Sequence, residues 1–220
     1  GPSFSLARKD LSLGLAAKVP CGLQDGVTCD NEYKTWKEVN SSSPDIKIEV
    51  YGPPPTSGTR DAFAELALGG GCKQIKWIKK YKKKDKKAWK KLCYTVREDG
   101  AFIEAGENDN LIIQKLNANP NALGVFGFSF LDQNRDSVKG ATVDGVDPTF
   151  DSIADGSYPA SRGLYVYAKK EHMGVTPGMT EFMELYLSDD VAGADGSLGD
   201  AGLIPLPQKE LDKVRANVLQ

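Results

Sequence analysis

The feature that most constrains the fold is a strand, a rigid turn and a helix in direct succession. Residues 45–51 alternate apolar and charged side chains, which is the period-2 pattern of a half-buried β-strand. Three prolines at residues 53–55 then stiffen the turn, and a helix is predicted to follow residues 56–59. We interpret the glycines at residues 69–71 as the signal that ends this helix.

Similar patterns predict further strands and helices along the chain. The predicted strands are residues 101–105, 124–130, 138–143 and 163–168. The predicted helices are residues 6–19, ended by Pro20, a short turn in 33–39, one or two helices in 72–93, then 108–117 capped by Asn108, 148–154, a helix from 177 through 187, and 206–219. Residues 193–202 are predicted to be a loop. Because strands and helices alternate, the predicted class is α/β with a largely parallel or mixed sheet.

The loop after the prolines has the chemistry of an anion site, in residues Thr56, Ser57, Gly58, Thr59 and Arg60. Backbone N–H groups at a helix start lack intrahelical partners, and the helix dipole places partial positive charge there. Glycine lets a ligand approach the backbone, hydroxyl groups donate to oxyanion oxygens, and the guanidinium fork matches two oxygens of a tetrahedral anion. The same residues also suit a plain helix N-cap with a surface arginine, so this pattern leaves both interpretations open.

A longer match supports the first interpretation. Residues 51–63 resemble the anion loop of bacterial PstS-type phosphate-binding proteins, and five further blocks resemble the same family in the same order: residues 97–100, 106–111, 127–134, 158–162 and 202–206. The resemblance extends along nearly the whole chain.

In that family, two α/β lobes with a type II periplasmic-binding-protein fold close on a dehydrated phosphate ion. The resemblance implies that Ser57, Gly58 and Thr59 contact phosphate oxygens and that Arg60 supplies the counter-charge. It also implies a non-enzymatic, exported receptor, periplasmic or extracellular, that needs no cofactor and presents inorganic phosphate to the permease of an ABC transporter. Residues 6–135 would form one complete lobe carrying the anion loop.

Two departures from the family pattern concern selectivity and completeness. Several members carry Arg-x-Asp before the loop, where this sequence has Pro53 and Pro55, so sulfate stays open as an alternative ligand. Residues 140–220 would supply only the returning segment of the other lobe, because we find no counterpart of the family's N-terminal third. We therefore expect weak phosphate binding by this chain alone, unless a second chain or copy completes the pocket. A truncated interaction lobe without transport function is the remaining alternative.

The four cysteines favour disulfides. Cys21 with Cys29 and Cys72 with Cys93 is the simplest of three connectivities, and free buried thiols are the alternative. A zinc site would require tighter spacing, and His172, the only histidine, is far away in the sequence. Disulfides favour an oxidising compartment such as the periplasm.

Charge is distributed unevenly along the chain. Eleven lysines and one aspartate lie between Cys72 and Cys93, whereas the remainder has 17 basic and 29 acidic residues. We interpret the lysine run as a solvated helical face with Trp77, Tyr81 and Trp89 packed inward, rather than as a nucleic-acid site. No nucleic-acid partner is therefore predicted.

Signals for other classes of protein are weak. No run approaches the roughly 18 consecutive apolar residues of a membrane-spanning helix. The segment around Ser129 lacks the last glycine of the Gly-x-Ser-x-Gly elbow, and His172 has no second histidine to form a catalytic or metal pair. The sequence therefore favours a binding protein over an enzyme.

Overall fold

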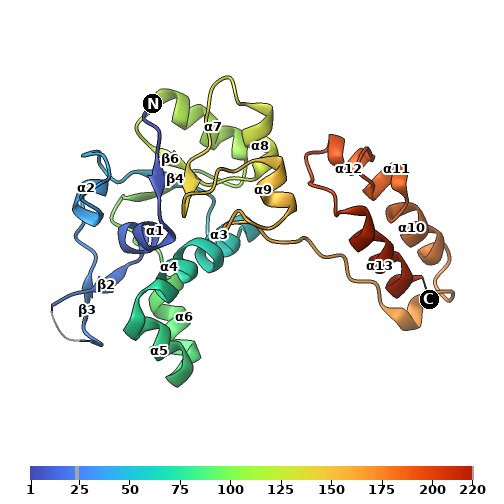
Figure 1. Cartoon of the computed structure of the whole chain (residues 1–220), viewed down its shortest axis with the longest axis horizontal. Helices are drawn as coiled ribbons and strands as arrows, with labels where there is room; N and C mark the ends of the chain where they lie inside the picture. The colour runs from blue at the N-terminus through green and yellow to red at the C-terminus, as the bar shows by residue number, and fades with distance from the viewer. Residues whose placement is uncertain (23–24, 220) are drawn as a thin grey trace. The chain divides into compact units, whose positions relative to one another are not determined.

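The chain forms two compact units, which are described separately. The computed structural model describes residues 1–22 and 25–219. Unit 1 comprises Gly1–Pro148 and Tyr158–Ser161, and unit 2 comprises Thr149–Ser157 and Arg162–Gln220 (Figure 1).

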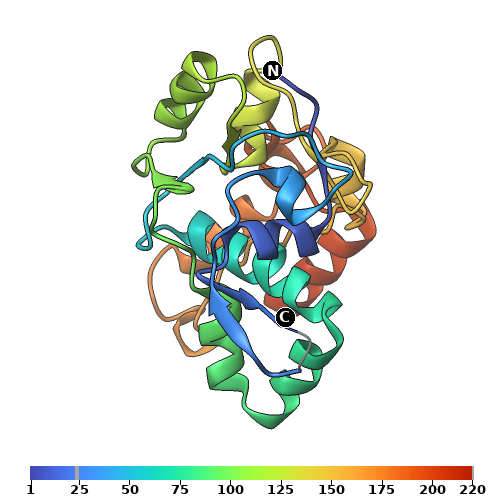
Figure 2. The ribbon, with the colours of Figure 1, turned by 90° about the vertical axis from the view of Figure 1, so that its left-hand side faces the viewer.

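Unit 1 is organised around a short parallel sheet. Its central strand β4 (Val50–Gly52) pairs on one side with β5 (Phe102–Glu104) and on the other with β6 (Leu123–Gly124). All three residues of β4 are buried. A second parallel pair joins β1 (Ser5–Leu6) to β7 (Thr142–Val143). β2 (Lys18–Pro20) pairs with β3 (Thr28–Asp30) as an antiparallel hairpin (Figure 2). The mixed α/β class predicted from the sequence is confirmed.

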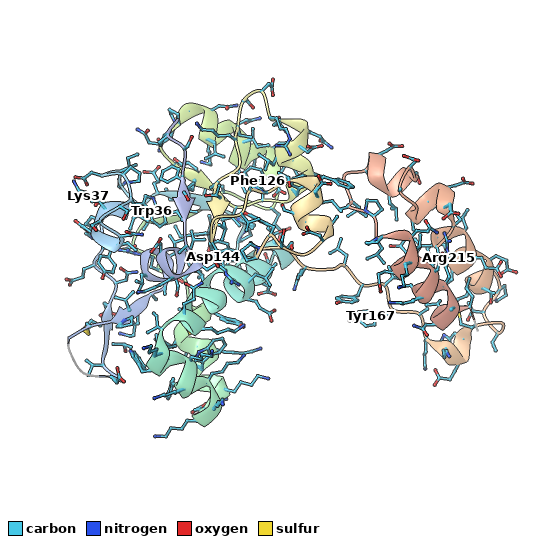
Figure 3. All side chains as sticks on the ribbon, viewed as in Figure 1. Trp36, Lys37, Phe126, Asp144, Tyr167 and Arg215 are labelled. Carbon is cyan, nitrogen blue, oxygen red and sulfur yellow. A yellow bond between two sulfur atoms is a disulfide. The ribbon has the colours of Figure 1, made fainter. Side chains whose placement is uncertain are left out.

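Helices surround these strands and enclose the main core. The helices of unit 1 are α1 (Arg8–Leu15), α2 (Trp36–Val39), α3 (Gly58–Phe63), the π-helix η1 (Ala64–Leu68), α4 (Gly69–Gln74), α5 (Lys76–Lys84), α6 (Lys86–Tyr94), α7 (Asp109–Ala118) and α8 (Phe128–Gln133). Trp36, labelled in Figure 3, is fully buried in a cluster with Leu15, Ile48 and Leu68. Asn108 caps α7 as predicted, since its side chain accepts a hydrogen bond from the Asn110 N–H.

The glycines at 69–71 do not end a helix, so that prediction was wrong. They form the first turn of α4, and the helical backbone continues from Gly58 through η1 to Gln74. The reason is packing against α1: a Cβ atom on Gly71 would lie 2.0 Å from the Arg8 carbonyl oxygen and 2.7 Å from Ser12 Cβ. Glycine is required here because the two helix backbones approach closely.

The helix predicted over residues 6–19 is also shorter than expected. Only α1 is helical, and residues on either side of it belong to β1 and β2. Tertiary hydrogen bonds compete with the helical ones: the Asn31 side-chain amide donates to the carbonyls of Leu13 and Ala16, both at 2.7 Å, and the Ala17 N–H donates to the Thr95 carbonyl. These bonds satisfy the end of α1 and turn the chain into β2.

Several predicted strands differ from the structure. The predicted strand 45–51 is realised only at its end, in β4, and 138–143 only in β7. Of residues 124–130, Gly124 belongs to β6 and residues from Phe128 onward form α8. Residues 163–168 form no strand, because no described segment pairs with them. A strand needs a hydrogen-bonding neighbour, which apolar alternation alone does not supply.

Unit 2 is a small helical assembly. It contains α9 (Phe150–Ala154), the 3-10 helix η2 (Lys170–His172), α10 (Met179–Tyr186), α11 (Asp189–Ala192), α12 (Ser197–Asp200) and α13 (Gln208–Val218). Thus the predicted loop 193–202 contains the short helix α12. Met183, Leu187 and Leu211 form its buried core. Arg215 joins its elements by donating to the Leu187 carbonyl and pairing with Asp189 at 2.7 Å (Figure 3).

Both disulfides have the predicted connectivity and lie in unit 1. The Cα atoms are 5.8 Å apart in Cys21–Cys29 and 6.0 Å apart in Cys72–Cys93. Within the part of the chain that the structure describes, no helix is both long and apolar enough to cross a bilayer.

Arg97 is a buried cation that ties three segments of unit 1 together. Its side chain is 3% exposed and donates hydrogen bonds to the Gly14 and Tyr33 carbonyls, at 3.2 and 2.9 Å, and to the Asp99 carboxylate. The bond from Arg97 is the main reason that the pKa of Asp99 lies below its ordinary value.

We predict that Arg97→Ala lowers the free energy of unfolding by about 2 to 3 kcal/mol, because one buried and one part-buried carbonyl lose their donor. Urea denaturation followed by tryptophan fluorescence measures the loss in unit 1, which holds all three tryptophans. Arg135→Ala is the control: its pair with Asp132 is 50% and 59% exposed, so a change within about 0.5 kcal/mol is expected. Equal effects of the two substitutions would contradict the structural role of Arg97.

Candidate functional site

The predicted anion loop lies at the carboxyl end of the central strand of the unit 1 sheet. β4 ends at Gly52, and the chain passes through Pro53–Pro55 into the helix that starts at Gly58. The segments that leave β5 and β6 start at the same edge, because all three strands are parallel. In open α/β sheets, ligands bind at this edge.

Ser57 caps the helix. Its backbone is extended, and its Oγ accepts a hydrogen bond from the Thr59 N–H at 3.2 Å. Gly58 is exposed, and a Cβ built on it would meet no atom within 4 Å. The helix start is therefore open on the side of Gly58, while one of its N–H groups is already satisfied by the cap.

Arg60 is more buried than a surface arginine. It is 9% exposed, donates to the Pro53 carbonyl at 3.1 Å, and its guanidinium carbon lies 4.0 Å from the centre of the Phe102 ring. Burial lowers the pKa of Arg60, and the negative charges of Glu104 and Glu98 partly oppose that shift. The arginine thus links the proline turn to β5 and places a positive charge next to that turn.

The Arg60 head group retains capacity for further hydrogen bonds. It carries five N–H donors, and the described contacts use the Nη1 group on Pro53. None of its other nitrogens is among the buried polar atoms that lack a partner. Those donors therefore still have access to solvent or to a ligand.

A carboxylate next to the loop was not among the site residues predicted from the sequence. Thr56 is exposed, and its hydroxyl donates a 2.7 Å hydrogen bond to Oε1 of Glu107, 51 positions along the chain. Glu107 follows β5, and so reaches the loop from the neighbouring strand. The sequence contains one weak indication of Glu107, which lies in block 106–111 of the family resemblance. Only the parallel pairing of β4 with β5 places it beside Thr56.

Asp109 links two of the segments that leave the sheet at this edge. Its carboxylate accepts a hydrogen bond from the Gly127 N–H at 3.2 Å, which links the first turn of α7 to the segment after β6. Burial raises the pKa of Asp109, and the bond from Gly127 acts in the opposite direction. The bond from Thr56 to Glu107 links the segments after β4 and β5, and the bond from Gly127 to Asp109 links α7 to the segment after β6. The segments that follow all three strands are thus connected by hydrogen bonds.

Comparison with known proteins identifies the family. A family model described as "PBP superfamily domain" matches residues 1–190. This chain belongs to that family. The predicted resemblance to PstS-type phosphate-binding proteins is also confirmed: this PBP-superfamily chain is 32% identical over 185 residues to "Phosphate-binding protein PstS" of Staphylococcus haemolyticus, and 29% identical over 192 residues to the protein of the same name in Staphylococcus aureus.

Solved structures give the same fold. A possible phosphate-binding protein from Planctomyces limnophilus matches with a TM-score of 0.67 and 24% identity, over 99% of this chain and 66% of that one. A protein from Clostridium perfringens, assigned as a phosphate ABC transporter substrate-binding protein and solved with bound phosphate, matches with a TM-score of 0.51 and 25% identity, over 88% of this chain and 60% of that one.

The matches also set the share of a relative that this chain represents. The alignment to the Staphylococcus haemolyticus protein covers 82% of this chain but 48% of the relative. The chain therefore spans about half the length of the curated relatives it matches.

We predict that Ser57→Ala lowers the free energy of unfolding by about 1 kcal/mol, because the Thr59 N–H loses its capping oxygen. Ser41→Ala, at an exposed turn position, is the control and should change stability by less than about 0.5 kcal/mol. Urea denaturation with tryptophan fluorescence measures both. If Ser57→Ala were as stable as the unsubstituted chain, the cap would contribute nothing to the helix start.

Proposed function

We propose that this chain binds inorganic phosphate at residues Thr56, Ser57, Gly58, Thr59 and Arg60, as part of the non-enzymatic receptor of an ABC-type phosphate importer. The observation that carries the proposal is an open helix start at the carboxyl end of the central buried strand, with an arginine held beneath it. The names of the relatives and the phosphate bound to the Clostridium perfringens protein support it.

The proposed binding mode uses donors that carry little charge. The exposed start of α3 offers backbone N–H groups, and Thr59 adds a hydroxyl that makes no side-chain hydrogen bond in the described part of the chain. Arg60 contributes the formal positive charge from below. A dianion held in this way exchanges its water shell for fixed dipoles, which hold it without a metal or cofactor.

We predict that Thr59→Val weakens phosphate binding by roughly fivefold to tenfold, because it removes one hydroxyl donor and keeps the side-chain shape. Isothermal titration of inorganic phosphate into the 220-residue chain measures the change. Thr176→Val, an exposed substitution in unit 2, is the matched control and should leave the affinity unchanged. Equal affinity of both variants would remove Thr59 from the proposed site.

Glu107 favours phosphate over sulfate as the ligand. A carboxylate beside an anion loop repels a fully ionised anion, but it can accept a hydrogen bond from an anion that still carries a proton. Near pH 7 phosphate carries at least one proton and sulfate carries none. We propose that the Glu107 carboxylate, held by Thr56 at 2.7 Å, supplies the discrimination that Pro53 and Pro55 cannot supply.

We predict that Glu107→Gln reduces the ratio of phosphate to sulfate affinity by roughly tenfold or more, because the amide neither repels sulfate nor requires the ligand proton. Competition between the two anions at pH 7 measures the ratio. Glu65→Gln makes the same charge change in η1 and should leave the ratio unaltered. An unchanged ratio in Glu107→Gln would exclude this selectivity role while leaving the phosphate site intact.

We further propose that residues 6–135 are one complete lobe and residues 140–220 the returning segment of a second lobe. An extended apolar segment in unit 2 supports this: Leu164 is 74% and Tyr167 90% exposed (Figure 3), and no described strand pairs with them. A partner strand would come from residues outside this sequence or from a second chain or copy. Hydrogen exchange tests the idea, since the amides of 164–167 should exchange quickly in this chain alone; slow exchange would contradict it.

The whole receptor is proposed to act outside the cytoplasm and to deliver phosphate to a permease. Two disulfides support an oxidising compartment. We propose that the chain catalyses no reaction, because a receptor of this kind releases its ligand unchanged.

A further inference from the structure

Most of the lysine run forms a helical hairpin. α5 and α6 are joined at Asp85, whose carboxylate caps α6 by accepting from the Ala88 N–H at 2.9 Å. The Cys72–Cys93 disulfide ties the end of α6 to α4, the helix that precedes α5. Ile78 and Trp89 are fully buried between the helices and the disulfide. The cationic side chains are therefore carried on a preformed scaffold.

The lysines of this run form no ion pair within the part of the chain that the structure describes. None of the eleven lysines between Cys72 and Cys93 takes part in any of the described ion pairs. Lys82 and Lys90 instead lie over the rings of Trp89 and Tyr94. The remaining ammonium groups are available to an anion from outside the chain.

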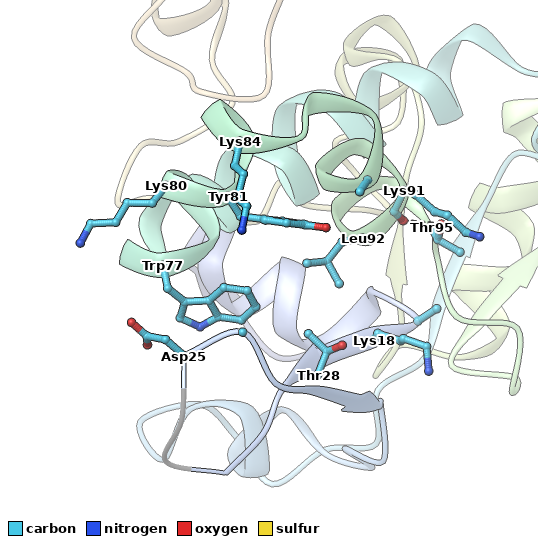
Figure 4. A pocket seen from close by; sticks show the side chains of 13 residues that line it. Lys18, Asp25, Thr28, Trp77, Lys80, Tyr81, Lys84, Lys91, Leu92 and Thr95 are labelled. Atoms are coloured by element: carbon cyan, nitrogen blue, oxygen red, sulfur yellow. Dashed lines mark hydrogen bonds between the residues drawn. The ribbon is translucent and has the colours of Figure 1, made fainter.

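A groove of about 620 Å³ lies between this hairpin and the β2–β3 hairpin. Trp77, Tyr81 and Leu92 line one side, and Thr28 lies on the other (Figure 4). The three hairpin side chains pack on the buried hairpin core, which leaves their other surfaces to the groove. This volume, with mostly apolar walls, is within the usual range for small-molecule sites.

The rim of the groove is cationic on the hairpin side. Lys80, Lys84 and Lys91 line it and pair with no acidic group among the described residues, whereas Lys18 is already paired with Asp30 at 2.7 Å. One carboxylate, Asp25, lies beside Trp77 (Figure 4), so an acidic head group would be placed toward Lys84 and Lys91 and away from Asp25.

We propose that this groove is a second binding site, for a small organic anion with an aromatic or aliphatic body and one acidic head group. The body would pack against Trp77, Tyr81 and Leu92, and the head group would pair with the rim lysines. Inorganic phosphate does not fit this description, because the apolar walls would strip its water without replacing the hydrogen bonds. The proposal does not depend on the phosphate site, which is formed by other elements of unit 1.

The hairpin offers a matched pair of variants. Lys84 and Lys91 line the groove, whereas Lys83 and Lys87, on the same two helices, do not. All four are exposed, so both double charge reversals should fold. The probe is 1-anilinonaphthalene-8-sulfonate, an aromatic body with one sulfonate, and its binding is measured by its fluorescence. Circular dichroism checks that each variant is folded.

We expect Lys84→Glu/Lys91→Glu to weaken probe binding by roughly tenfold and Lys83→Glu/Lys87→Glu to weaken it less than about threefold. Naphthalene-2-sulfonate should displace the probe, while sodium sulfate and inorganic phosphate at equal ionic strength should not. Equal losses in both variants would show a general polyanion surface and overturn the proposal. No loss in either would place the probe on other apolar surfaces, such as residues 164–167, and would overturn it as well.

Discussion

The candidate site depends on the buried parallel pairing of β4 with β5 and β6. β4 is paired with a strand on each side, so its edges are not accessible to a ligand. What lies at its carboxyl end is the segment that follows it, the proline turn and the helix start at Gly58. The same pairing brings Glu107 from β5 to Thr56, and Asp109 closes the edge by bonding the segment after β6. The loop is thus held by three strands rather than by its own short sequence.

Arg60 shows how one residue can stabilise the site and contribute to its chemistry. Its packing on Phe102 and its bond to the Pro53 carbonyl orient the loop, and the same charge is available to a bound anion. A lysine could not replace it, because a point charge lacks the planar fork that stacks on a ring and donates in several directions. Glu107 adds the opposite sign at the rim, so the site would prefer an anion that still carries a proton.

The lysine-rich hairpin and the loop at residues 56–60 are formed by different elements of unit 1. The lysine hairpin carries its charge on a disulfide-bonded scaffold formed by elements other than the proposed anion loop, and its aromatic side chains face the groove as well as the hairpin core. The sequence-based interpretation that Trp77, Tyr81 and Trp89 pack inward therefore holds fully only for Trp89, which is buried, while Trp77 and Tyr81 also line the groove. Helical periodicity identifies a face of a helix, but it does not show what lies opposite that face.

The sequence by itself determined the features that rest on local chemistry. These are the α/β class, the Asn108 cap, the strand–turn–helix unit around residues 56–60, and the cysteine pairing that local spacing favours. Only the tertiary structure decided the features that depend on contacts between distant segments. Gly71 lies within a helix because only glycine leaves room for the Arg8 carbonyl of the neighbouring helix. α1 ends where the Asn31 side chain bonds the carbonyls of Leu13 and Ala16. Glu107 lies beside the loop because β5 pairs with β4. A periodic pattern reports what a segment can become, whereas its ends and its neighbours are set by steric and hydrogen-bonding partners that lie far away in the sequence.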